Sequence, residues 1–233
     1  SRRRHTRFKC DWSSDVCSSD LYKANRTKSQ EKSELNWSSI FECMNKIRNE
    51  LKEFFPYRVI HLEGCEADDV IATLVNEFHT TDSIMILSGD KDFNQLHYDG
   101  VQQYDPTRKK TIACTDPSKY LEEHILRGDK SDGVPNVLSD SDTFVLGKRQ
   151  KTLTQKKIDE LTGLGLFGKF DHQLHANYVR NHMMIDLCNT PDELKAKILE
   201  SYHAQTKKNG SKLMNYFIAN RLKNLMEHMG DFT

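Results

Sequence analysis

No stretch of this sequence is apolar over the roughly 18–20 residues that a membrane-spanning helix needs. Neither charge is in excess, because Lys and Arg together number 34 and so do Asp and Glu; net charge therefore indicates no class of partner. The six cysteines show no Cys-x-x-Cys spacing, which argues against a disulfide framework or a zinc site and fits reduced thiols in a cytoplasm. The length of 233 residues is enough for one domain, or two small ones, with a core large enough to fold.

The first 21 residues do not read as part of a folded domain. Asp11–Leu21 follows neither a helical nor a strand period, and a common sequencing-library adapter read in frame encodes it. A natural basic tail is the alternative, but we interpret residues 1–21 as non-native, so their arginines predict no DNA-binding arm. The genuine sequence is then expected to begin at Tyr22, inside a longer protein.

Strand and helix signals alternate after this segment. Apolar residues recur at helical spacing before Pro56 and again over Glu66–His79. Tyr57–Leu62 and Ser83–Leu87 have the composition of buried strands. This order predicts an α/β fold with a mostly parallel sheet flanked by helices.

The second half is predicted to be mainly helical. A hairpin is expected over residues 100–114, followed by helices over 117–127, 153–161, 171–187, 191–204 and 211–229. A change in composition near Gly128–Pro135 divides the chain into an α/β part, 22–127, and a helical part, 128–233.

Seven carboxylates gather in three short segments at the ends of these elements. They are Glu66, Asp68 and Asp69, then Asp90 and Asp92, then Asp129 and Asp132. The first two segments follow the two predicted strands, and ligand sites in such sheets form beyond the carboxyl ends of strands. Carboxylates brought together there would repel one another unless cations lay between them, and oxygen ligands favour magnesium or manganese over zinc. The first hypothesis is a two-metal site that cleaves phosphodiester bonds.

Each acidic segment also has a purely structural explanation. Acids in the first turn of a helix, as in Glu66–Asp69, interact favourably with the helix dipole. Gly128–Gly133 read alone is a polar turn. Asp90 and Asp92 are harder to explain, since two acids directly after a buried strand are costly without a counter-ion. The three segments in this order favour a metal site.

In combination these segments resemble a known family. Glu66–Asp69, Ser88–Phe93 and Gly128–Pro135 are similar to the motifs of the 5′-nuclease or flap-endonuclease superfamily, which has a PIN-like core. Tyr22–Arg26 resembles the basic motif of that family's helical arch, and the C-terminal sequence is similar to the bacteriophage ribonuclease H branch. The resemblance implies a metal-dependent 5′-3′ exonuclease and flap endonuclease that removes RNA primers or flaps during DNA replication.

The resemblance also implies a role for each motif. The part over 22–127 would be the nuclease core with a remnant of the arch, and 128–233 the DNA-binding part. A first Mg²⁺, replaceable by Mn²⁺, would be held or oriented by Glu66, Asp68, Asp69 and Asp90, and a second by Asp92, Asp129 and Asp132. Such ions lower the pKa of a bound water, generate hydroxide and stabilise charge on the scissile phosphate. Lys23 and Arg26 would stabilise the transition state from the arch.

The implied substrates are DNA and RNA–DNA duplexes with 5′ ends or flaps. Residues placed to grip the duplex are Lys130, Ser131, Lys148, Arg149, Lys151, Lys156 and Lys157, although a run of basic residues is more often a solvated face. A single-stranded-DNA-binding protein and a sliding clamp are the implied partners, in the cytoplasm of a phage-infected host.

Two departures from the family pattern affect these expectations. The family uses further Asp residues from strands before the arch, and nothing before Tyr22 resembles them, so we expect the chain as given to be impaired in catalysis. Val137–Phe144 replaces the glycine-rich hairpin that binds potassium in cellular members.

The histidines are predicted to be isolated surface or core residues, including His61, His79, His97, His124, His172 and His175. His97, five residues after Asp92, is the one exception considered, although a role for it is not favoured.

Two other functions remain open. One is a ribonuclease of the PIN type, which the long helical second half argues against. The other is a non-catalytic binder of branched or duplex nucleic acid, which would show steep salt dependence without needing metal.

Overall fold

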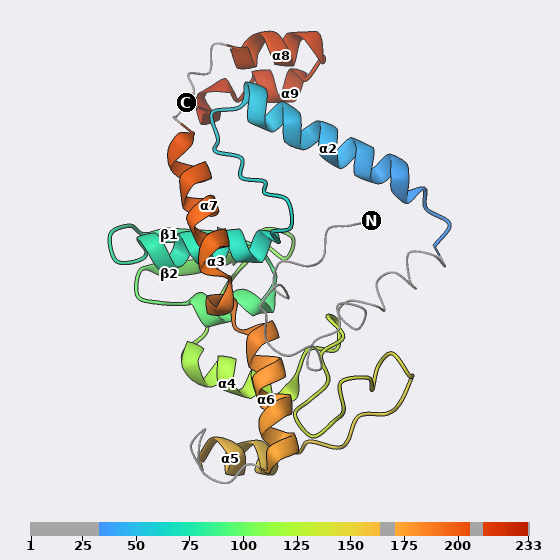
Figure 1. Cartoon of the computed structure of the whole chain (residues 1–233). Helices are drawn as coiled ribbons and strands as arrows, with labels where there is room; N and C mark the ends of the chain where they lie inside the picture. The colour runs from blue at the N-terminus through green and yellow to red at the C-terminus, as the bar shows by residue number, and fades with distance from the viewer. Residues whose placement is uncertain (1–32, 164–170, 206–211, 233) are drawn as a thin grey trace. The chain divides into compact units, whose positions relative to one another are not determined.

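A computed structural model describes residues 33–163, 171–205 and 212–232 (Figure 1). These residues form two compact units, each described separately below. Within the described part, the first unit is Glu63–Lys195, and the second combines residues 33–62 with the chain after Lys195. The expected division at residue 128 concerns function and stays a prediction.

The first unit contains a small mixed sheet. Strands β1 (Ile84–Leu87) and β2 (Val101–Asp105) pair in parallel, with Ile84 opposite Val101, and β3 (Lys110–Ile112) pairs antiparallel with β2. The strand predicted at 83–87 and the hairpin predicted over 100–114 are both confirmed, the first by β1 and the second by β2 and β3.

Helix α3 (Ala67–Phe78) and the 3-10 helix η1 (Lys91–Leu96) cover this sheet with apolar side chains. The buried cluster that they share with the strands consists of Ala72, Val75, Ile86, Phe93, Leu96, Val101 and Leu187. Helix α3 lies where the apolar periodicity over 66–79 places it. Ala72 and Val75 of α3 pack with Ile86 of β1, the strand that precedes the loop of Asp90.

Helices form the rest of the first unit. They are α4 (Pro117–Arg127), α5 (Gln155–Gly163), α6 (His172–Ile185), η2 (Leu187–Asn189) and the start of α7 (Asp192–Ala204). Helices α4 and α6 lie side by side (Figure 1), and Ile125 of α4 packs with Met184 and Ile185 of α6. The neighbouring Leu126 packs in a second cluster with Ile158. The helical prediction for this region is confirmed.

The second unit is helical, with α2 (Trp37–Phe54), the end of α7, α8 (Leu213–Ala219), α9 (Lys223–Met226) and the 3-10 helix η4 (Met229–Phe232). Phe55, Leu213 and Phe217 form its core. The expected single helix over 211–229 is interrupted, because Arg221 adopts a positive φ of 56° between α8 and α9. Helix α2 buries none of its residues fully, and Met44 and Ile47 on its predicted apolar face are exposed.

The strand predicted at Tyr57–Leu62 is wrong. The peptide groups of Val59 hydrogen-bond to the side-chain amide of Gln205, which donates to the Val59 carbonyl and accepts from its N–H. A single glutamine thus occupies the groups that a neighbouring strand would have paired. In the described part of the chain, only β1 and β2 are therefore parallel. No helix there is both long and apolar enough to span a bilayer.

Candidate metal centre

The loop after β1 carries two of the predicted carboxylates. Asp90 caps η1 by accepting a hydrogen bond from the Asp92 N–H at 3.1 Å. Gln103 of β2 is fully buried, and its side-chain amide donates to the Ser88 and Asp90 carbonyl oxygens at 2.8 and 2.7 Å. Strand β2 therefore holds the loop in place through the side chain of Gln103. The prediction that Asp90 and Asp92 follow the carboxyl end of a strand is confirmed.

The end of α4 brings a third carboxylate to the same place. Gly128 terminates the helix with a φ of 68°, and its N–H donates to the His124 carbonyl. This left-handed residue turns the chain so that Asp129 faces back toward the last turn of α4. The turn closes where the Val134 N–H donates to the Asp129 carbonyl at 2.7 Å.

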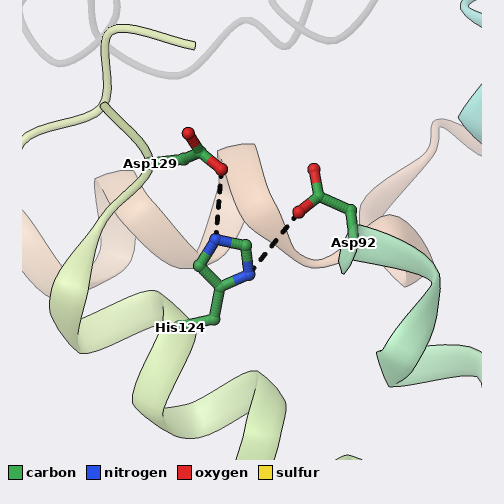
Figure 2. Close-up of side chains that lie close together, drawn as sticks. All are labelled: Asp92, His124 and Asp129. Atoms are coloured by element: carbon green, nitrogen blue, oxygen red, sulfur yellow. Dashed lines mark hydrogen bonds and ion pairs between the residues drawn. The ribbon is translucent and has the colours of Figure 1, made fainter. Parts of the chain in front are cut away.

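Asp92, His124 and Asp129 meet in one cluster (Figure 2). His124 Nε2 lies 3.3 Å from Asp129 Oδ2, and His124 Nδ1 lies 3.8 Å from Asp92 Oδ1. The His124 and Asp129 side chains are only 7% and 6% exposed. Among the described residues this is the one group of three or more potential metal ligands whose ligand atoms lie within 4.8 Å of one another.

Asp129 is held as a carboxylate by several donors. Burial would raise its pKa, but hydrogen bonds from His124, Lys91 and Ser131 hold the pKa well below its usual range. The Lys91 Nζ to Asp129 Oδ2 distance is 2.8 Å, and both the Ser131 N–H and its hydroxyl donate to Oδ1. Burial would lower the pKa of Lys91, yet this contact and the neighbouring carboxylates raise it.

The pKa of Asp92 is raised, whereas that of Asp129 is lowered. Burial raises the pKa of Asp92 to about 6, Asp90 and Asp129 add to the rise, and His124 and Lys91 oppose it. Its Oδ1 is buried without a hydrogen-bond partner, and so is the facing His124 Nδ1. An inaccessible carboxylate oxygen of this kind is stabilised by a cation or by a proton.

The first acidic segment lies elsewhere, at the start of α3. Asp69 is 1% exposed; its Oδ2 accepts from the Glu66 N–H at 3.1 Å and its Oδ1 from the Thr190 hydroxyl at 3.0 Å. Asp68 Oδ1 accepts from the Asp69 N–H. Asp69 thus caps its helix and ties it to Thr190 near η2. The structure does not bring Glu66, Asp68 or Asp69 into the cluster of Asp92, His124 and Asp129.

The remaining predicted residues lie around the turn that follows Asp129. Asp132 is half-buried and lies outside the cluster. Ser131 is used in binding Asp129, as described above. Lys157 pairs with Glu160 at 3.2 Å, and Lys148 lies 3.4 Å from Asp142. The exposed basic residues are Lys130, Lys148, Arg149, Lys151 and Lys156. Lys23 and Arg26 fall outside the described residues.

The expectation that the histidines are isolated is wrong for His124. Its position could have been suspected, because Leu121 and Ile125 mark the buried face of α4 and His124 lies on that face, five residues before Asp129. His97, the exception considered from sequence, uses both ring nitrogens structurally. Nε2 bonds to Gln103 at 2.9 Å, and Nδ1 accepts from the Cys114 N–H at 3.1 Å.

Replacing Gly128 by Ala is expected to destabilise the protein by about 2 kcal/mol or more, because strain at positive φ adds to a steric overlap. A Cβ at Gly128 would overlap the Val134 carbonyl oxygen and the Pro135 carbonyl group. Gly147→Ala is the matched control, since Gly147 also has a positive φ, 66°, but its Cβ would meet nothing within 4 Å. Urea unfolding of both variants measures the difference, and equal losses would contradict the assigned role of the Gly128 turn.

The raised pKa of Asp92 predicts a pH dependence of stability in the metal-free protein. Between pH 4 and 6 the folded state retains a proton that the unfolded chain has released, so the free energy of unfolding falls as pH rises, by roughly 2–3 kcal/mol. Asp129, whose pKa is lowered, acts at lower pH, where stability is lost as pH falls below about 4. Urea titrations at several pH values should show that Asp92→Asn removes the decline between pH 4 and 6. An unchanged decline in that variant would refute the assignment.

Comparison with known proteins places this chain among nucleases. The family model described as the 5′-3′ exonuclease N-terminal resolvase-like domain matches residues 16–125, and the model described as the C-terminal domain of T4 RNase H matches residues 118–232. Ribonuclease H of Enterobacteria phage T4 is 32% identical over 220 residues, which cover 91% of this chain and 72% of that protein. A 5′-3′ exonuclease of Mycoplasmopsis pulmonis is 27% identical over 173 residues, or 70% of this chain and 54% of that protein.

Solved structures agree on the fold. A bacteriophage T5 protein co-crystallised with metal ions has a TM-score of 0.56 at 17% identity, covering 77% of this chain and 78% of its own. A T5 flap endonuclease in complex with DNA and metal ions has a TM-score of 0.52 at 18% identity, covering 77% of this chain and 76% of its own. At these identities the likeness shows the 5′-nuclease fold.

Proposed function

The chain belongs to the family of 5′-3′ exonucleases that includes ribonuclease H of phage T4, and we propose that it is a structure-specific nuclease that uses two divalent cations to remove 5′ ends and flaps during DNA replication. The observation that carries the proposal is the buried cluster of Asp92, His124 and Asp129 beyond the carboxyl end of β1. Its substrates would be the RNA primers and displaced 5′ strands of a replicating duplex, in the cytoplasm of an infected host.

The chemistry of the cluster fits a divalent cation. Asp92 Oδ1 is buried and has no hydrogen-bond partner, although Lys91 and His124 lie close by. Mg²⁺ in such sites lowers the pKa of a coordinated water and neutralises charge on the scissile phosphate, and Mn²⁺ substitutes for it in many enzymes. We propose that Glu66, Asp68, Asp69 and Asp90 hold or orient one ion, and that Asp92, Asp129 and Asp132 serve the other, partly through water.

The protein's own groups set the charge around this site. Lys91, paired with Asp129, offsets one of the carboxylate charges and keeps its ammonium protonated through the working pH range. Asp90 is positioned by the η1 cap, so the two acids of the loop after β1 keep a fixed spacing. Asp69 is proposed to act by orienting its helix, since both of its oxygens accept hydrogen bonds.

Basic residues that follow Asp129 in the sequence support contact with a duplex backbone. Exposed basic side chains follow the turn that carries Asp129, and phosphate contacts of this type position nucleic acid without reading its sequence. Lys130, Ser131, Lys148, Arg149, Lys151, Lys156 and Lys157 are the proposed contacts. Lys23 and Arg26 are proposed to approach the scissile phosphate. A single-stranded-DNA-binding protein and a sliding clamp remain proposed partners.

Cleavage of labelled branched substrates tests the function. Because the chain as given is expected to be impaired, the assay uses a protein in which the Asp-bearing strands expected before Tyr22 are restored. This restored protein should release 5′ fragments from a 5′-flap duplex and from an RNA–DNA hybrid with a free 5′ end when Mg²⁺ is present, and EDTA should abolish the products. Cutting of single-stranded RNA without preference for junctions would instead indicate a PIN-type ribonuclease. Salt-sensitive binding of the flap with no cleavage in Mg²⁺ or Mn²⁺ would overturn the proposal in favour of a non-catalytic binder.

A further inference from the structure

Two buried polar atoms of different residues face each other in the cluster. His124 Nδ1 and Asp92 Oδ1 are 3.8 Å apart, which is too long for a hydrogen bond, and neither has another hydrogen-bond partner (Figure 2). The His124 side chain is 7% exposed. Leaving such atoms unsatisfied costs about 1–3 kcal/mol each, so the arrangement calls for a partner.

The other side of the imidazole determines which nitrogen carries the proton. Asp129 accepts from Lys91 on Oδ2 and from Ser131 on Oδ1, so the contact of 3.3 Å between His124 Nε2 and Asp129 Oδ2 assigns an N–H to Nε2. A ring that binds an ion through its other nitrogen then offers the lone pair of Nδ1, which faces Asp92 (Figure 2). A histidine that binds a metal through one nitrogen commonly donates the other N–H to a carboxylate, as here.

Asp129 itself is occupied by donors. Its Oδ2 accepts from Lys91 and His124, and its Oδ1 accepts from the N–H and hydroxyl of Ser131. A carboxylate in these contacts orients the imidazole more readily than it enters the coordination sphere of an ion. The atoms with free lone pairs toward the gap are those of His124 and Asp92.

The spacing of these two atoms suits one ion. Two ligand atoms each about 2.1 Å from a metal are about 3.0–4.2 Å apart as the angle at the metal opens from a right angle to a straight line. The observed 3.8 Å lies within this range. An imidazole nitrogen favours Mn²⁺, Co²⁺ or Zn²⁺ over Mg²⁺, which prefers oxygen alone and keeps its waters.

We propose that His124 Nδ1 and Asp92 Oδ1 bind one divalent transition-metal ion, with Asp129 positioning the imidazole through Nε2. The inference rests on the proposed metal-dependent function and deepens it, because one of the two ions would sit in a mixed nitrogen and oxygen site. The site should therefore prefer Mn²⁺ or Co²⁺ to Mg²⁺.

Direct metal titration tests this without any nucleic acid. Calorimetry on the full metal-free chain should show Mn²⁺ and Co²⁺ binding at least about 10-fold tighter than Mg²⁺. His124→Gln should weaken Mn²⁺ binding by about 10–100-fold and leave Mg²⁺ binding at the other, all-oxygen site little changed. His79→Gln is the matched control, since His79 is a half-buried imidazole outside the cluster whose Nδ1 contacts carbonyl oxygens of α3, and it should retain the wild-type preference for Mn²⁺.

A second measurement covers the case in which His124→Gln fails to fold. In wild-type protein with ¹⁵N-labelled histidine, Zn²⁺ should shift the Nδ1 resonance of His124 while Nε2 keeps its proton. An unshifted Nδ1, or equal Mn²⁺ affinity in folded His124→Gln, would overturn the inference and leave His124 as a bridge between two carboxylates. Metal binding through His124 without flap cleavage by the restored protein would instead contradict the proposed function, so the two failures are distinguishable.

Discussion

Asp92→Asn is expected to lower the rate of 5′-end cleavage by about 100-fold or more, with little loss of stability at neutral pH. The substitution keeps the shape of the side chain and removes a charge that a divalent cation requires, and losing stabilisation of transition-state charge typically costs a factor of 10²–10³. Stability should not suffer, because burial disfavours the ionised carboxylate in the metal-free protein.

Single-turnover cleavage of a 5′-flap substrate by the restored protein, at several Mg²⁺ concentrations, measures this effect. Asp82→Asn is the control. Asp82 is exposed in the turn before β1, and its substitution removes the same charge from the same unit. Activity in Asp92→Asn within threefold of wild type would show that Asp92 does not serve the cation. A matching loss in Asp82→Asn would point to net charge as the cause.

Arg180→Met is expected to destabilise the protein by about 3 kcal/mol or more, the largest effect on stability that we foresee. Arg180 of α6 is 4% exposed, and its guanidinium donates to the carbonyl oxygens of Pro135 and Ser139 and to the side chains of Asn177 and Asn181. Met fills similar volume but leaves several buried acceptors without their donor.

Urea unfolding at pH 7 measures the loss, with Arg149→Met as the surface control expected to stay within about 0.5 kcal/mol of wild type. Arg180→Lys should recover little, since an ammonium cannot reproduce the planar fork of donors. The loss should extend to the candidate metal centre, because Pro135, which accepts from Arg180, directly follows Val134, whose N–H closes the turn that carries Asp129. A stable Arg180→Met variant would mean that water replaces the guanidinium, so that the buried network contributes little.

The sequence alone predicted correctly that Asp90 and Asp92 lie in the loop after a strand. Asp90 and Asp92 follow a short apolar strand, and strand, loop and 3-10 helix are local in sequence, so composition alone predicts their order. Asp129 was not predicted from its own segment, because Gly128–Gly133 alone reads as a polar turn; it became a candidate only together with the other acidic segments and through the family resemblance.

The first acidic segment shows where this reasoning fails. Glu66–Asp69 opens a helix as predicted, but the strand expected before it does not form, so the argument that placed both segments on one sheet edge lost its premise. What satisfies Asp69 is the hydroxyl of Thr190, 121 residues along the chain. No pattern within a single segment reveals a contact of that range.

His124 was missed for a related reason. A lone histidine on the apolar face of a helix reads as a core residue, and its partners come from a loop 32 positions earlier and a turn five positions later. Periodicity predicted that the side chain is buried. Which groups it meets depends on how η1 packs against α4, and that is a property of the tertiary structure.

Gln103 links the sheet to the loop that carries Asp90 and Asp92. The strand position that it occupies is fully buried, yet its side chain is polar. Its amide donates to the Ser88 and Asp90 carbonyl oxygens and pairs with His97, and an apolar side chain would leave these groups without their partners. Engineering that fills buried positions of this nuclease with apolar residues should therefore hold position 103 fixed.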